Sequence, residues 1–155
     1  MAELRSILLA IEHATRQRDE LVKVAARAKR NVGFAEDQMA QLQGYATETD
    51  SRWTGAAPGV LSAELIRHHY QFMDRLQQAI GMQSGVLANS RRQLELANKT
   101  LLQAEFRLSG LNQILKTRQT ALLRKQERRE QRQTDEFAAM LYTRARASAV
   151  SGETK

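Results

Sequence analysis

Apolar residues recur along this chain at two positions of a seven-residue repeat, and one short stretch interrupts the pattern. Before the interruption, thirteen of fifteen repeat positions are apolar: Leu4, Ile11, Arg18, Ala25, Val32, Met39, Ala46 and Trp53 in one register, and Ile7, Ala14, Leu21, Ala28, Ala35, Leu42 and Thr49 in the other. A heptad sustained over this length is typical of a coiled-coil helix. It predicts a first helix over about residues 3–53.

A second heptad follows the interruption. One register is apolar at all nine positions, namely Ile66, Met73, Ile80, Leu87, Leu94, Leu101, Leu108, Leu115 and Leu122. The companion register is apolar at four of nine: His69, Leu76, Gln83, Ser90, Ala97, Ala104, Leu111, Arg118 and Lys125. The pattern predicts a second helix over about residues 62–143, with left-handed supercoiling.

The interruption contains the only proline, Pro58, within a glycine-rich stretch. Proline cannot continue a helix, so we place the turn at residues 54–61 and expect Ser62 to cap the second helix. A single short turn makes the two helices antiparallel neighbours, with each residue opposite roughly residue 115 minus its own number. The predicted fold is all-α: one long antiparallel two-helix coiled-coil hairpin, residues 1–147. The second helix overhangs the first beyond about Leu115, and residues 148–155 form a disordered tail.

Composition excludes several classes of function. The 155 residues include no cysteine, which excludes disulfides and thiolate metal sites. No apolar run is long enough to span a bilayer and no signal peptide is evident, so we expect a cytoplasmic protein. A two-helix hairpin has no interior for a pocket, no phosphate-binding glycine loop is present, and His13, His68 and His69 do not have metal-ligand spacing. We therefore expect no enzyme activity, no cofactor and no metal.

The net charge of +7 is concentrated late in the chain. Between Lys116 and Gln133, seven basic residues oppose two glutamates, and the basic group centres on Arg124, Lys125, Arg128, Arg129 and Arg132. Three interpretations are open: a solvated helix face, a contact with an acidic or polar protein surface, or nucleic-acid binding. No aromatic residue is interleaved for base stacking, which disfavours nucleic acid.

Two stripes of apolar and aromatic residues lie beside the turn. Phe72, Leu76, Ala79 and Gln83 follow helical spacing, and so do Gln38, Leu42, Tyr45 and Thr49. The pairing rule brings the two stripes to the same height. They form either a docking patch or a widened seam. Clustered exposed aromatics usually mark a partner site, which is the reason for considering a docking patch.

The same segments carry a family resemblance. Residues 38–45, 51–53, 69–80 and 131–138 resemble the flagellar export protein family FliJ, and the similarity extends from Met1 to about Arg144. The resemblance implies a cytoplasmic, non-enzymatic component of the flagellar type III export apparatus, peripheral at the inner membrane. It implies three partners: the hexameric export ATPase, the membrane export gate and export chaperones. It further implies that the eight residues of the two stripes bind the gate. We predict in addition that the basic overhang engages the ATPase ring.

Three alternatives stay open at this point. A stalk protein of a virulence-type secretion system would have a related architecture. A generic helical-hairpin scaffold or chaperone would show the same heptads. A nucleic-acid-binding coiled coil would show the same basic segment.

Overall fold

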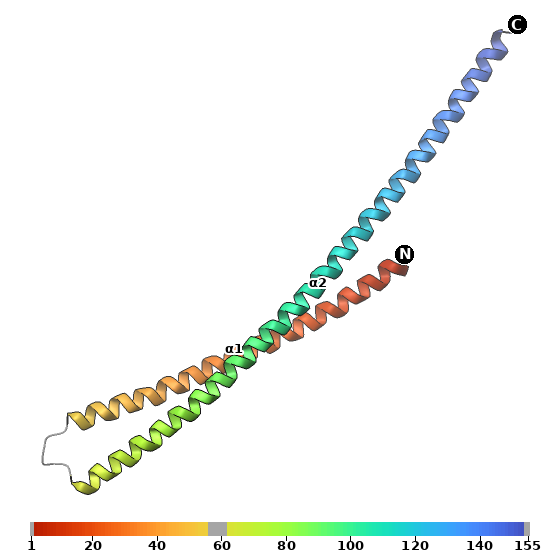
Figure 1. Ribbon diagram of the computed structural model, residues 1–155. Helices are drawn as coiled ribbons and strands as arrows, with labels where there is room; N and C mark the ends of the chain where they lie inside the picture. Colours follow the sequence, from red (N-terminus) through yellow and green to blue (C-terminus); the bar gives the residue numbers. More distant parts are fainter. Residues whose placement is uncertain (1, 56–61, 154–155) are drawn as a thin grey trace. The chain divides into compact units, whose positions relative to one another are not determined.

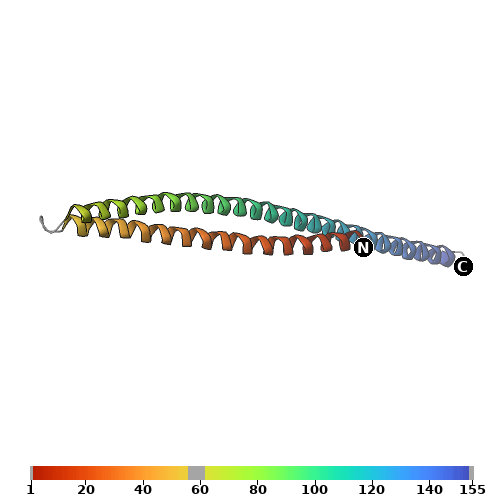
Figure 2. The same cartoon turned by 90° about the horizontal axis from the view of Figure 1, so that it is seen from below.

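The computed structural model describes residues 2–55 and 62–153, which form two long helices. Helix α1 comprises Ala2–Thr54 and helix α2 comprises Ala63–Glu153. The two helices run in opposite directions and pack against each other (Figures 1 and 2). The predicted all-α, two-helix hairpin is therefore confirmed.

Hydrogen bonds close both helix ends next to the turn. The amide of Gly55 donates to the carbonyl of Ser51 at 3.0 Å, closing the last turn of α1. The Ser62 hydroxyl accepts a hydrogen bond from the amide of Leu65 at 3.1 Å, as an N-cap does. The predicted cap is thus confirmed. Residues 56–61, which make up most of the predicted turn, lie outside the described residues.

The end of α2 differs from the prediction. The helix does not stop near residue 143 but continues to Glu153, so residues 148–153 are helical where a disordered tail was expected. Ala145, Ala147 and Ala149 are strong helix formers, and no proline or glycine intervenes before Gly152. Helical propensity does not require an apolar seam, and the loss of the heptad was therefore a poor indicator of where the helix ends.

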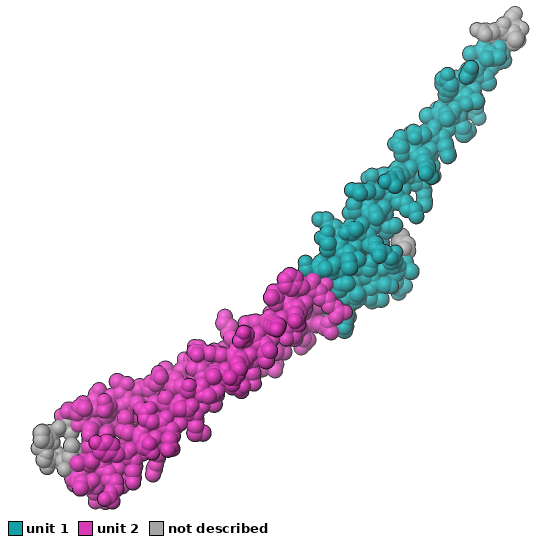
Figure 3. Space-filling view, in the orientation of Figure 1, with its two compact units in different colours: residues 1–13, 108–155 teal, residues 14–107 magenta. Residues whose placement is uncertain are grey.

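The chain divides into two compact units, and each helix contributes to both (Figure 3). Unit 1 comprises Met1–His13 and Leu108–Lys155, and unit 2 comprises Ala14–Arg107. The expectation of one domain over residues 1–147 stays a prediction.

The heptad positions form the interface between the helices. In α1 all fifteen are buried or half-buried. In α2 the same holds from Met73 to Leu115 in one register and from His69 to Leu111 in the other. The most buried side chains are small or medium in size: Ala14, Ala25, Val32, Ala35, Leu76 and Leu108. The seam is correctly predicted and thin, because alanine contributes little burial per residue.

The register of the hairpin differs from the prediction by about one heptad. In unit 1 Glu3 forms an ion pair with Arg118, and in unit 2 Gln38 contacts Gln83 and Trp53 stacks on His69. The residue numbers of these pairs add to 121, 121 and 122, against the expected value of about 115. A heptad returns to the same face after seven residues, so both registers bury the same side chains. α1 therefore pairs with α2 beyond the expected limit at Leu115.

Candidate functional site

The structure brings the two predicted stripes of unit 2 to one level. Gln38 and Gln83 meet at one end, where the Gln83 amide nitrogen lies 3.3 Å from the side-chain oxygen of Gln38. Just beyond the other end, the rings of Trp53 and His69 are parallel within 2° and 3.9 Å apart. The register between these contacts places the members opposite each other as Gln38 with Gln83, Leu42 with Ala79, Tyr45 with Leu76, and Thr49 with Phe72. The stripes match along their whole length, whereas the expected register would have overlapped them only in part.

Burial divides the eight predicted residues into two groups. Phe72 and Tyr45 are 48% and 56% exposed, and Gln38 is also exposed. Leu76 is only 8% exposed, and Leu42, Thr49, Ala79 and Gln83 are half-buried. Phe72, Tyr45 and Gln38 are thus available to a partner, whereas Leu76 mainly holds the helices together. We call these three exposed residues, with half-buried Ala79, the turn-side patch.

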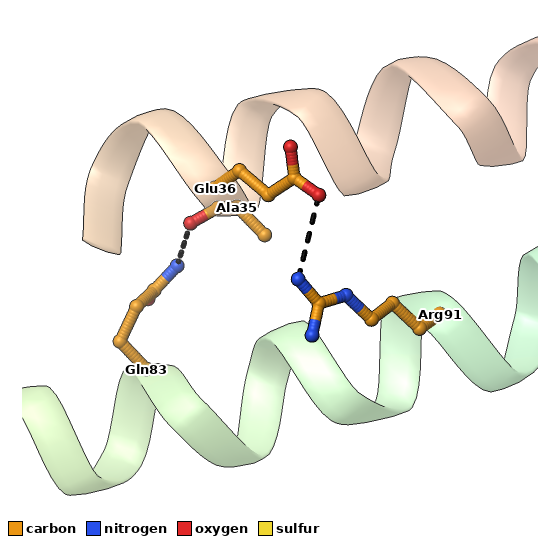
Figure 4. Close-up of polar contacts among 4 residues, drawn as sticks. All are labelled: Ala35, Glu36, Gln83 and Arg91. Carbon is orange, nitrogen blue, oxygen red and sulfur yellow. Dashed lines mark hydrogen bonds and ion pairs between the residues drawn. The ribbon is translucent and has the colours of Figure 1, made fainter. Parts of the chain in front are cut away.

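Gln83 links the two helices through polar contacts (Figure 4). Its side-chain nitrogen donates to the backbone oxygen of Ala35 on α1 at 3.0 Å. The same nitrogen contacts the side-chain oxygen of Gln38, which is also on α1. Arg91 lies about two helical turns beyond Gln83 on α2. It approaches to 3.5 Å from Glu36, the residue that follows Ala35 on α1. A polar side chain at a seam position is stabilising only when it has such partners.

Sequence reasoning missed the aromatic contact beside the turn. Trp53 and His69 were both recognised as seam positions, but not as partners, because the expected register separated them. Tyr70 adds an edge-on contact to His69 at 5.9 Å. The signal in the sequence was weak, because Trp53 directly precedes the predicted turn at residues 54–61 whereas His69 follows it two helical turns later.

The overhang of α2 in unit 1 is exposed throughout. Every residue from 116 to 152 is exposed, including the predicted basic group Arg124, Lys125, Arg128, Arg129 and Arg132. Lys125 lines a shallow depression with Glu3, Leu4 and Arg118, where α1 begins. The basic group therefore starts at the end of the paired region and continues along a segment covered by no other described residue.

The same overhang also carries apolar side chains on one face. Leu123, Phe137, Met140 and Leu141 are each at least half exposed. At 100° per residue they fall on one side of α2, while most of the basic residues, Arg124, Lys125, Arg128 and Arg132, fall on the opposite side. A partner that contacts this segment from both sides would find apolar surface on one and positive charge on the other.

Within residues 2–55 and 62–153, no three histidine, aspartate or glutamate side chains gather as a metal site would require. Over the same residues, neither helix has a stretch long and apolar enough to cross a membrane. The structure offers exposed surfaces on the outside of its two helices.

A coiled-coil hairpin with such outward surfaces is a protein of the binding and scaffolding class. Residues 6–147 match the family described as Flagellar FliJ protein, and the chain belongs to this family. The resemblance found in the sequence is therefore confirmed. Members of the family are components of flagellar protein export, and the family is not a known enzyme family. Neither a curated protein nor a solved structure matches the chain.

Proposed function

We propose that this protein is a stalk-like coupling component of the flagellar export apparatus. It connects the hexameric export ATPase to the export gate at the cytoplasmic face of the inner membrane, and it escorts export chaperones. Its membership of the FliJ family supports a role in flagellar export. The coupling role rests on two exposed surfaces of different chemistry.

The turn-side patch of unit 2 is the surface that we assign to the gate. Phe72 and Tyr45 expose aromatic rings from opposite helices, and the contact between Gln38 and Gln83 holds the helices in this register. Large exposed rings on a rigid support lose little conformational entropy on binding and are frequent binding hot spots. These two exposed aromatics, which lie one helical turn apart along the paired helices, are the observation that carries the gate assignment.

The exposed overhang of unit 1 is the surface that we assign to the ATPase ring. Its basic and apolar residues point in opposite directions, so a partner that surrounds the helix could contact both. A ring with a central opening is a partner of this kind. The long continuous helix α2 contains both assigned surfaces, which makes it suited to transmit a change from one partner to the other.

The gate assignment is tested with the double variant Phe72→Ala, Tyr45→Ala. Binding of the full-length protein to the cytoplasmic part of the gate protein is measured by isothermal titration calorimetry, and motility is scored in cells. We expect binding to weaken by roughly a hundredfold, since hot-spot side chains each contribute about 1–2 kcal/mol or more. The matched control is Phe34→Ala, Phe106→Ala, which removes two exposed rings elsewhere. Normal gate binding by the double variant would refute the assignment.

The ring assignment is tested by replacing Arg124, Lys125, Arg128, Arg129 and Arg132 with glutamine. We expect loss of binding to the export ATPase and of any effect on its hydrolysis rate, with helicity unchanged because all five side chains are exposed. Replacement of five basic residues in unit 2, namely Lys23, Lys29, Arg30, Arg67 and Arg92, serves as the control. Undiminished ATPase binding, or a strong salt-dependent affinity of the wild type for duplex DNA, would count against the proposal.

A further inference from the structure

The two outer flanks of unit 2 differ sharply in charge. One flank, which we call the neutral flank, consists of residues at heptad spacing: Val24, Asn31, Gln38 and Tyr45 in α1, and Phe72, Ala79, Val86, Gln93 and Thr100 in α2. None of these nine is charged, and the same spacing reaches charged residues only at the two ends of unit 2, at Arg52 and Arg107. The other, the charged flank, consists of Val22, Lys29, Glu36, Gln43 and Asp50 in α1, and Tyr70, Gln77, Ser84, Arg91, Asn98 and Glu105 in α2. Five of these eleven are charged.

Contacts between the helices support this division. The ion pair of Glu36 with Arg91 joins two members of the charged flank. The side chain of Gln38, on the neutral flank, instead meets Gln83. Flanking positions of a two-stranded coiled coil usually carry glutamate and lysine that pair across the helices. The charged flank follows this rule and the neutral flank does not.

A seam that is widened by one neutral flank is the pattern of a helix that packs against more than one neighbour. A strict two-stranded coiled coil needs apolar residues only at the two seam positions, whereas helices in larger bundles add one flanking position. The row next to the neutral flank continues the apolar surface, since Phe34, Met82 and Leu96 are 65%, 75% and 64% exposed. Val86, a member of the neutral flank itself, is half exposed. Unit 2 therefore exposes a broad surface with apolar side chains at its centre, on which an additional helix could pack.

The charges beside this surface indicate the character of that helix. Within the span of the neutral flank, the adjoining row carries Arg27 and Arg75, and neither forms an ion pair with any described residue. Glu20 and Glu48, at the two ends of the same row, already pair with Lys23 and Arg52. The surface thus has two uncompensated arginines and no uncompensated carboxylate in that row. Guanidinium groups bind carboxylates in a planar, often bidentate geometry.

We infer that the neutral flank docks an amphipathic helix of another protein, whose apolar stripe is bordered by glutamate or aspartate. The stripe lies on Phe34, Met82 and Val86, and the acidic border reaches Arg27 and Arg75. Flexible, exposed methionine suits a surface that accepts helices of differing sequence. A second copy of this chain is a poorer occupant, because it would bring the same two arginines and no acidic border. The turn-side patch, which is assigned to the gate, forms the part of the neutral flank nearest the turn. The inference goes beyond the proposed function, since Phe34, Met82, Val86 and Leu96 are outside the assigned gate contacts.

The test uses the full-length protein and two synthetic amphipathic helical peptides with the same leucine stripe. Glutamate borders the stripe in one peptide, and lysine replaces it in the other. Fluorescence anisotropy should show that the glutamate peptide binds at least about tenfold more tightly. The variant Met82→Lys, Val86→Lys should lose this binding, while Gln77→Lys, Ser84→Lys on the charged flank should retain it. Circular dichroism verifies that each variant keeps its helical content.

The charge requirement is tested separately. Arg27→Gln, Arg75→Gln should remove most of the preference for the glutamate peptide, whereas Arg30→Gln, Arg92→Gln changes net charge equally and should preserve it. Equal affinity for the two peptides, no binding of the glutamate peptide, or binding that survives Met82→Lys, Val86→Lys would overturn the inference. So would a wild-type dimer in analytical ultracentrifugation that this variant abolishes, because a second copy would then occupy the flank. Phe72 and Tyr45 are unchanged throughout, so the gate assignment is tested independently.

Discussion

The indole of Trp53 lies flat on the imidazole of His69, with ring centroids 3.9 Å apart and planes within 2° of parallel. This contact joins the last turn of α1 to the first turns of α2. In the alternative register, one heptad away, Trp53 would lie at the level of Ser62 and the ring contact would be absent. The stack therefore stabilises the observed register specifically, and it does so beside the turn-side patch.

Replacement of His69 by alanine should expose Trp53 to solvent. Because this is the only tryptophan, its fluorescence reports on one site. We expect the emission maximum to move to longer wavelength and the free energy of unfolding to fall by about 1 kcal/mol, the usual contribution of a stacked aromatic pair. Emission spectra and urea unfolding provide the measurements. His68→Ala is the control, since His68 is exposed and does not stack, and an unchanged spectrum in His69→Ala would contradict the contact.

Gln83 should contribute to stability through its hydrogen bonds, and burial of an apolar side chain of similar size should be able to replace that contribution. Gln83→Ala removes the bond to the Ala35 carbonyl, and we expect a loss of about 0.5–1.5 kcal/mol in the free energy of unfolding. Gln83→Leu should recover that loss, because an apolar side chain suits the seam. Thermal unfolding followed by circular dichroism measures both, with exposed Gln77→Ala as the control. If Gln83→Leu were clearly less stable than the wild type, the hydrogen bonds would be worth more than apolar burial at this position.

Leu76 and Phe72 should separate folding from binding. Leu76→Ala leaves a gap in the seam and should cost about 2 kcal/mol or more. Phe72→Ala removes a half-exposed ring and should cost about 1 kcal/mol or less. Urea unfolding of the two variants gives the comparison. An equal or larger loss for Phe72→Ala would place that ring in the interior and remove it from the turn-side patch.

Gly85→Ala should stabilise α2. A Cβ atom at this position meets no other atom within 4 Å, so the substitution introduces no clash. Alanine is favoured over glycine within a helix by up to about 1 kcal/mol, largely because glycine has more conformational freedom to lose. The melting temperature should therefore rise. The reverse change at an exposed position of the same helix, Ala88→Gly, should lower it by a similar amount, and a drop in Gly85→Ala would indicate a need for close approach that the structure lacks.

The sequence by itself determined the helices, the seam and the cap at Ser62. These are local properties: a seven-residue repeat fixes which side of each helix is apolar, and a serine oxygen beside free amides caps a helix wherever it occurs. The same local information located both candidate surfaces, since helical spacing alone groups Phe72 with Ala79 and gathers the arginines of the overhang. It was insufficient at the end of α2, where alanine continues the helix after the heptad has ceased.

Only the tertiary structure decided the register, because a repeating seam looks the same after a shift of seven residues. Contacts that do not repeat resolve this degeneracy: Glu3 with Arg118, Gln38 with Gln83, and Trp53 with His69. They also brought Leu76 and Tyr45 to the same level, so that an outward-facing ring lies beside an inward-facing seam residue. The contrast between the neutral and charged flanks likewise became visible only once the helices were paired, since a flank is formed by two segments distant in sequence.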